Sequence, residues 1–216
     1  MLRVVLDLSQ PLDGQLAVAI RAIRDGLVVA FPTDTLYGLA VDPQSEQALQ
    51  RLIRLKGRDG TKTIGLVAAD VQQAGDLVRL DATSARVAAR FWPGPLTMLV
   101  AARAGLPLPI VGERGLVGVR VPDHPVARAL ARLAGHALTA TSANVSGSAA
   151  TADPDEVARQ LPQVDVLIDA GTLPGGPPST IVDVTETPAR LVREGAVPWD
   201  RVLESVGSAA PDSTAQ

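Results

Sequence analysis

The 216-residue sequence has no cysteine and only two histidines, His124 and His136. The absence of cysteine excludes disulfide bonds, a thiol nucleophile and a cysteine-ligated metal, and it is typical of proteins from a reducing cytoplasm. Neither histidine has neighbours at the spacing of a metal site, so the sequence predicts no protein-bound metal. The Gly-x-Ser-x-Gly motif and the Ser/His/Asp order of serine hydrolases are missing as well.

Aromatic residues are scarce, with two Phe, one Tyr and two Trp. They are scattered, so they form no stacking platform of the kind that single-strand nucleic-acid binders use. The net charge of −3 argues against a protein that mainly coats nucleic acid, although it allows a local basic cleft. No apolar run reaches the roughly 20 residues of a membrane-spanning helix, and residues 1–9 do not resemble a signal peptide. We therefore expect a cytoplasmic protein without a membrane partner.

Two common nucleotide-binding signatures are also missing. The sequence contains no Gly-x-x-x-x-Gly-Lys-Ser/Thr loop, and no Gly-x-Gly-x-x-Gly follows a predicted strand. Any nucleotide site must therefore use another arrangement of backbone and cations.

Short apolar runs alternate with amphipathic segments along the chain, and 46% of the residues are hydrophobic. This pattern predicts an α/β protein (α+β by some schemes) with a twisted mixed open sheet, flanking helices and a concave basic cleft. We expect one domain over residues 1–204 and a disordered tail over residues 205–216, which are rich in Ser, Ala, Pro and Thr. Residues 103–114 look like a mobile loop. Helices are expected over residues 11–25, 46–55, 71–78, 83–92, 124–133 and 154–161. Strands are expected over residues 2–8, 27–31, 64–69, 96–101, 116–121, 137–141, 164–170, 181–184 and 190–193.

Both lysines of the protein, Lys56 and Lys62, fall in one segment between a predicted helix and a predicted strand. Every other basic residue except the histidines is an arginine. Two lysines as point charges, with Arg58 as a planar fork between them, suit a polyphosphate or a carboxylate. A solvated helix end, whose cations interact with the helix dipole, is the alternative. These residues alone leave both interpretations open.

Polar insertions follow two of the predicted strands, at residues 32–39 and 141–147. Ligands of open α/β sheets gather at strand ends, so these insertions and the lysine segment predict one shared crevice. The alternative is a pair of turns whose side chains satisfy the local backbone. Arg120 lies in an otherwise apolar strand, where an unpaired cation is costly, so it should meet either an internal carboxylate or an anionic ligand.

Seven segments occur in an order that carries a family resemblance. They are residues 32–39 (PTDTLYGL), 56–58 (KGR), 93–97 (PGPLT), 119–122 (VRVP), 142–147 (SANVSG), 179–183 (STIVD) and 193–195 (REG). Together they resemble the YrdC/TsaC family of threonylcarbamoyl-AMP synthases, from about residue 30 to residue 197. The resemblance implies that residues 1–204 form a YrdC-like catalytic domain of the single-domain type. The longer members of the family add a carboxy-terminal domain, for which this chain is too short.

The resemblance implies a nucleotidyltransferase that joins L-threonine, bicarbonate or CO2, and ATP into threonylcarbamoyl-AMP and pyrophosphate. Mg2+ would bridge the phosphates and be held mostly by ATP and water. A partner transferase complex would then use the product to modify the adenosine beside the anticodon of certain tRNAs. Neither chemical step needs a protein nucleophile, so the site must supply proximity and positive charge.

The resemblance also implies roles for individual residues. The implied catalytic residues are Lys56, Arg58, Ser142 and Asn144. The implied ATP and phosphate ligands are Lys56, Arg58, Lys62, Ser142, Asn144 and Arg193. The implied threonine ligands are Thr33, Thr35, Tyr37, Arg120 and Ser179, with Arg120 as the fork for the carboxylate.

Some positions depart from the family pattern. Asp59 stands where proline usually follows Lys-x-Arg, Ala149 and Ala150 replace a Ser-Pro pair, and Pro178 stands where glutamate commonly precedes Ser-Thr. Two alternatives therefore stay open. One is a non-enzymatic module of the same fold that binds double-stranded RNA or tRNA, and the other is a paralogue with a different substrate.

Overall fold

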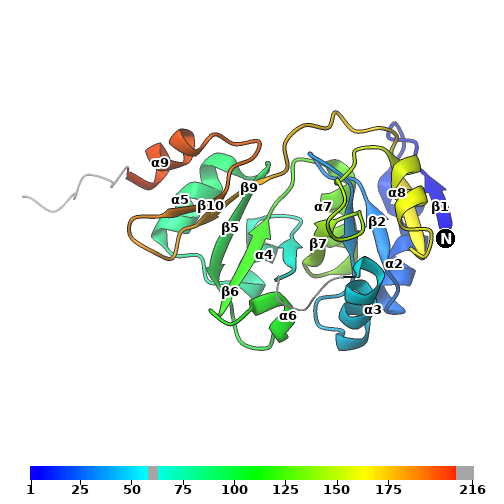
Figure 1. Ribbon diagram of the computed structural model, residues 1–216, viewed down its shortest axis with the longest axis horizontal. Helices are drawn as coiled ribbons and strands as arrows, with labels where there is room; N and C mark the ends of the chain where they lie inside the picture. Colours follow the sequence, from blue (N-terminus) through cyan, green and yellow to red (C-terminus); the bar gives the residue numbers. More distant parts are fainter. Residues whose placement is uncertain (58–62, 208–216) are drawn as a thin grey trace, which may run out of the picture.

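The computed structural model describes residues 1–57 and 63–207 (Figure 1). The strands in this part of the chain are β1 (Leu2–Val5), β2 (Val29–Phe31), β3 (Gly38–Ala40), β4 (Gly65–Val67), β5 (Leu96–Ala101), β6 (Leu116–Arg120), β7 (Leu138–Ser142), β8 (Val166–Asp169), β9 (Thr180–Asp183) and β10 (Arg190–Arg193). The helices are α1 (Leu12–Gln15), α2 (Ala17–Arg24), α3 (Glu46–Lys56), α4 (Val71–Leu77), α5 (Ala82–Phe91), α6 (Leu108–Val111), α7 (Pro125–Ala134), α8 (Pro154–Gln160) and α9 (Trp199–Gly207).

The strands form one mixed sheet in the order β1-β8-β2-β3-β7-β4-β6-β5-β9-β10. Pairing is parallel for β1/β8, β2/β8, β4/β6 and β5/β9, and antiparallel for the other neighbours. Strand β7 joins the two halves, because it pairs with β3 on one side and with β4 on the other. Figure 1 shows β1 with α2, α3 and α8 at one end of the molecule, and β10 with α5 and α9 at the other. The predicted α/β class and mixed open sheet are confirmed, whereas the concave basic cleft stays a prediction.

Alternating side chains of β2 divide the core into two layers. Val29 and Phe31 pack in a cluster with the buried residues of α2 and α7, whereas Ala30 packs in a second cluster with Leu49 and Leu52 of α3. Successive side chains of a strand point to opposite faces of the sheet. Helices α2 and α7 therefore cover one face of this half of the sheet, and α3 covers the other.

Helix α3 has clear end signals that fix where the lysine segment begins. The side chain of Ser45 accepts a hydrogen bond from the backbone N–H of Ala48, which caps the first turn. Gly57 ends the helix in the left-handed conformation, with φ of 57°, a conformation that suits glycine. Lys56 is consequently the last helical residue.

The structure differs from the sequence-based expectations in several places. The helix expected over residues 11–25 is two helices, α1 and α2, separated at Leu16. Strand β3 and helix α9 were not expected, and α9 runs to Gly207, so the prediction of a disordered tail is wrong for residues 205–207. Residues 208–216 lie outside the described residues. The expected loop over residues 103–114 contains α6, whose Ile110 is fully buried, and Pro109 accepts a backbone hydrogen bond from Ile64.

None of the helices among the described residues combines the length and the apolar character that crossing a membrane would require.

Candidate functional site

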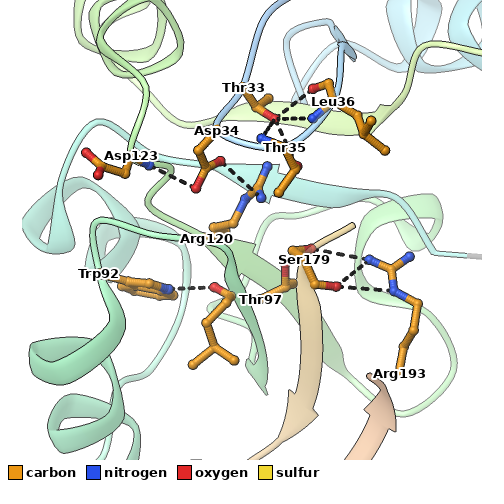
Figure 2. Close-up of polar contacts among 11 residues, drawn as sticks. Thr33, Asp34, Thr35, Leu36, Trp92, Thr97, Arg120, Asp123, Ser179 and Arg193 are labelled. Atoms are coloured by element: carbon orange, nitrogen blue, oxygen red, sulfur yellow. Dashed lines mark hydrogen bonds and ion pairs between the residues drawn. The ribbon is translucent and has the colours of Figure 1, made fainter. Parts of the chain in front are cut away.

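Several predicted site residues come together where β5, β6 and β9 lie side by side. Strand β6 is antiparallel to β5, and β9 is parallel to β5, so the end of β6 lies beside the starts of the other two strands. Arg120 ends β6, Thr97 is the second residue of β5, and Ser179 directly precedes β9. Figure 2 shows these side chains together with Arg193, the last residue of β10.

Arg120 is a buried cation with a buried carboxylate beside it. Its Nη1 atom lies 3.2 Å from Asp34 Oδ1, and both side chains are 9% exposed. The two atoms are within ion-pair distance but are not aligned as a hydrogen bond, and neither has another hydrogen-bond partner among the described residues. Burial lowers the pKa of Arg120, the Asp34 carboxylate raises it, and the nearby Arg193 guanidinium lowers it. The sequence predicted that Arg120 would meet either an internal carboxylate or an anionic ligand. The structure shows the internal carboxylate, Asp34.

The two threonines after β2 differ in what their hydroxyl groups do. Thr33 Oγ1 donates to Leu36 O at 2.7 Å and accepts from the backbone N–H groups of Thr35 and Leu36 at 3.2 and 3.3 Å. The Thr33 hydroxyl group therefore satisfies the local backbone of the turn, which was the alternative to a ligand-binding role for this polar insertion. Thr35 Oγ1 lies 3.2 Å from Thr33 Oγ1, and its side chain extends toward Arg120 in Figure 2.

Ser179 is held by both neighbouring strands. Its Oγ lies 3.0 Å from Thr97 Oγ1. Arg193 donates to the Ser179 carbonyl from Nε and Nη2 at 3.2 and 2.7 Å, and Nη2 also donates to Ser179 Oγ at 3.2 Å. Burial lowers the pKa of Arg193. A cationic fork thus fixes a hydroxyl group close to Arg120.

Lys56 connects the end of α3 to the turn after β7. It is 4% exposed, and Nζ donates to Asn144 O at 2.8 Å, to Asn144 Oδ1 at 3.3 Å and to the carbonyl of Ser142. Ser142 Oγ donates to Asn144 Oδ1, and Asn144 Nδ2 donates to the carbonyls of Val145 and Ser148. The alternative of a solvated helix end is therefore wrong for Lys56. Arg58 and Lys62 lie outside the described residues.

Tyr37 takes a structural position. Its hydroxyl group donates to Gly171 O at 2.8 Å and accepts from the backbone N–H of Ala170 at 3.2 Å. The residue is 1% exposed, and burial raises the pKa of Tyr37 to about 12. The phenol attaches the chain after β8 to the segment before β3, and it does not join the residues around Arg120.

Backbone pairing links the Arg120 and Lys56 groups. Tyr37 O accepts from the N–H of Ala143 at 2.9 Å, and Gly38 of β3 pairs with Ser142 of β7. The polar segments at residues 32–39 and 141–147 are thus adjacent, whereas the shared crevice stays a prediction. Two surface hollows of about 410 and 340 Å3 lie elsewhere, one lined mainly by α2 and one by α3, and none of the predicted site residues lines them.

Two residues at the site were not assigned a role from the sequence. Asp34 lies in the first polar insertion. Because Arg120 was expected to need an anion, a carboxylate in that insertion was the sequence signal that could have assigned the pairing. Thr97 lies in the PGPLT segment, where nothing in the sequence distinguished it from a core position. Among the described residues, no group of three or more His, Asp or Glu side chains could hold a metal ion.

Comparisons with known proteins identify the family of the chain. A family model for the Sua5/YciO/YrdC domain, described as "Telomere recombination", matches residues 21–195. A threonylcarbamoyl-AMP synthase from Methylococcus capsulatus is 40% identical over 171 residues, which cover 78% of this chain and 92% of the relative. A threonylcarbamoyl-AMP synthase from Pyrococcus abyssi is 33% identical over 197 residues, which cover 90% of this chain and 58% of the relative. The chain therefore spans little more than half the length of the Pyrococcus protein.

Two solved structures have the same fold. P. abyssi Sua5 complexed with L-threonine superposes with a TM-score of 0.88 at 32% identity, covering 95% of this chain and 60% of that one. E. coli YciO superposes with a TM-score of 0.82 at 27% identity, covering 91% and 96%. Given the match over residues 21–195 and these relatives, the chain belongs to the Sua5/YciO/YrdC family.

Proposed function

We propose that the protein is an L-threonylcarbamoyladenylate synthase, which forms threonylcarbamoyl-AMP and pyrophosphate from L-threonine, bicarbonate or CO2, and ATP. The observation that carries the proposal is the buried guanidinium group of Arg120, together with the exposed Arg193, whose guanidinium group donates to the hydroxyl group of Ser179. The names of the relatives and the threonine in the Pyrococcus structure support it.

The threonine site is proposed around Arg120. The guanidinium of Arg120 faces one carboxylate, Asp34, and a second cation, Arg193, lies near enough to lower its pKa. Two cations next to one carboxylate favour the binding of a further anion, and a planar fork suits a carboxylate. Thr35 and Ser179 supply hydroxyl groups close to this anion position, where they could bind the amino acid's polar groups.

The nucleotide site is proposed at the turn over residues 142–147 together with the lysine segment. Lys56 holds this turn by three donated hydrogen bonds, so its main role is to position Ser142 and Asn144. Arg58 and Lys62 remain our predicted phosphate ligands. Magnesium is proposed to arrive with the nucleotide, coordinated by phosphate oxygens and water.

The chemistry needs arrangement more than a reactive side chain. The amine nitrogen of threonine forms a bond to the carbon of CO2 and loses a proton, which gives a carbamate. A carbamate oxygen then attacks the α-phosphorus of ATP, and pyrophosphate leaves with the electrons of the broken P–O bond. Holding the reactants together contributes up to roughly 7 to 11 kcal/mol in favourable cases, and the arginines stabilise the added negative charge. A carbamate decomposes readily in water, so exclusion of solvent would protect it.

The product is an activated intermediate for tRNA modification. We propose that a transferase complex in the cytoplasm consumes it to modify the adenosine beside the anticodon. Weak direct binding of tRNA is compatible with the proposal but is not needed for it, because the synthase reaction has no RNA substrate.

The test is pyrophosphate release by the purified protein with ATP, threonine and bicarbonate, each omitted in turn, without tRNA. The proposal predicts that release needs all three reactants. Serine and valine in place of threonine test the pocket, and we expect valine to be rejected strongly because it cannot pair with groups placed for the hydroxyl. Release that is independent of threonine would contradict the proposal.

A further inference from the structure

The Asp34 carboxylate joins three parts of the chain. Its Oδ1 lies 3.2 Å from Nη1 of Arg120 at the end of β6, and its Oδ2 accepts the backbone N–H of Asp123, just before α7, at 3.1 Å. Asp34 itself belongs to the segment between β2 and β3 (Figure 2). One side chain therefore braces both ends of the short connection from β6 to α7.

The electrostatic setting makes this carboxylate important for Arg120. Asp34 is the carboxylate that pairs with Arg120 among the described residues. An uncompensated buried charge is strongly destabilising, and Arg193 adds a second positive charge nearby. Asp34 therefore lets Arg120 stay charged and buried before any ligand arrives.

The contact between Asp34 and Arg120 leaves hydrogen-bonding capacity for a ligand. Nη1 of Arg120 and Oδ1 of Asp34 have no aligned hydrogen-bond partner among the described residues, although they lie within ion-pair distance. The carboxylate thus holds the guanidinium by charge, without occupying a donor of the fork in a directed hydrogen bond. When a side chain is already ordered in the free protein, binding its ligand costs less conformational entropy.

We propose that Asp34 is a positioning residue, whose carboxylate orients the Arg120 fork to receive the carboxylate of the amino-acid substrate. The inference rests on the proposed function. Asp34 acts through Arg120 and makes no contribution to the nucleotide. A change at Asp34 should therefore alter the use of threonine selectively.

The first variant is Asp34→Asn, which keeps the shape of the side chain and removes its charge. We expect the KM for threonine to rise about tenfold or more, because a misoriented Arg120 would lose a hydrogen bond to the charged carboxylate of the substrate, while kcat and the KM for ATP stay close to wild type. The matched control is Asp76→Asn, the same substitution at an exposed position of α4, which should leave all three constants unchanged.

The second variant, Asp34→Glu, separates positioning from charge compensation. It keeps the negative charge but moves it by one methylene group, so positioning predicts a raised KM for threonine, whereas simple charge compensation predicts a wild-type value. This variant also serves if Asp34→Asn fails to fold, which circular dichroism would reveal.

The outcomes separate the inference from the proposed function. If the wild type releases pyrophosphate without threonine, both fall. If the wild type needs threonine and a folded Asp34 variant keeps the wild-type KM for it, only the positioning role is overturned. A parallel change in kcat and both KM values, or a failure of both variants to fold, would assign Asp34 to the fold and overturn the inference as well.

Discussion

Arg120 and Lys56 are both buried cations at strand or helix ends, but the fold treats them differently. Lys56 donates to oxygen atoms of the turn after β7, which satisfies much of its hydrogen-bonding capacity. Arg120 has a counterion at 3.2 Å without an aligned hydrogen bond. At the residue scale, Lys56 therefore holds the turn after β7, whereas Arg120 keeps a buried donor, Nη1, without an aligned hydrogen bond among the described residues.

Replacing Arg120 by glutamine should remove the guanidinium group that is proposed to bind the carboxylate of threonine. Each hydrogen bond to a charged group is worth about 1.5 to 3 kcal/mol, so Arg120→Gln should raise the KM for threonine at least about tenfold and leave the KM for ATP nearly unchanged. Steady-state pyrophosphate release measures both constants. Arg79→Gln, at an exposed position, is the control. An unchanged KM for threonine in folded Arg120→Gln would remove Arg120 from the site.

Replacing Lys56 by methionine should affect stability as well as activity. The substitution removes a charged donor from the carbonyl oxygen atoms of Ser142 and Asn144, and a buried acceptor that loses its donor costs about 1 to 3 kcal/mol. We expect a lower free energy of unfolding in urea and a loss of turnover. Full turnover with wild-type stability would show that the turn does not depend on the ammonium group.

At the element scale, the site depends on close crossings of backbone. The segment after β10 crosses the start of β9, where Ala196 N–H donates to Pro178 O at 2.9 Å and Val197 N–H donates to Thr180 Oγ1 at 3.0 Å. A Cβ atom on Gly195 would lie 2.1 Å from Pro178 O and 2.7 Å from Ser179 C. Glycine is required here because two backbones approach each other.

Gly195→Ala should therefore displace the chain that carries Ser179. Because the clash is with backbone, it cannot be relieved by a side-chain rotation. We expect a lower Tm and a raised KM for threonine. Gly75→Ala is the control, since a Cβ there meets nothing within 4 Å and alanine favours a helix interior. Equal Tm values for Gly195→Ala and the wild type would refute the crossing as a constraint.

His124, the residue just before α7, should make the free energy of unfolding depend on pH. Burial lowers the pKa of His124 from its ordinary 6.5, against the opposing effect of Asp34 and Asp123. The unfolded chain therefore binds a proton at a higher pH than the folded protein does, and stability falls as the pH drops below about 6.5. Urea unfolding from pH 7.5 to 5.5 should show this slope.

His124→Gln should flatten that slope. Two carboxyl groups with lowered pKa values, the exposed Asp81 and the buried Asp183, affect stability only in more acidic solutions, because their native-state protonation begins below the ordinary carboxyl range. The same slope in the wild type and in His124→Gln would assign the effect to another group.

Sequence patterns predicted the longer elements better than the short ones. The strand at residues 96–101 has the expected bounds, and the helices near residues 46–55 and 83–92 shift by one residue at most. Strand β3 has three residues and α6 has four, which is too short for a period to show. Such elements form because neighbours pair with them, as β3 does between β2 and β7, and this pairing is not encoded locally.

At the scale of the whole molecule, the site residues come from distant parts of the chain. Lys56 contacts Ser142 across 86 positions, and Asp34 contacts Asp123 across 89. The sequence predicted that polar strand ends would meet. It could not show that Lys56 is buried by the turn, that Tyr37 faces the chain after β8, or that Asp34 pairs with Arg120, because each of these depends on the order of strands in the sheet.

The identity of the product tests the account most directly. The purified protein should be incubated with ATP, threonine and 13C-labelled bicarbonate, and the nucleotide products should be analysed by mass spectrometry. The account predicts threonylcarbamoyl-AMP that carries one 13C atom, and its loss when threonine is omitted. An adenylate without the label, or one that forms without threonine, would contradict the account.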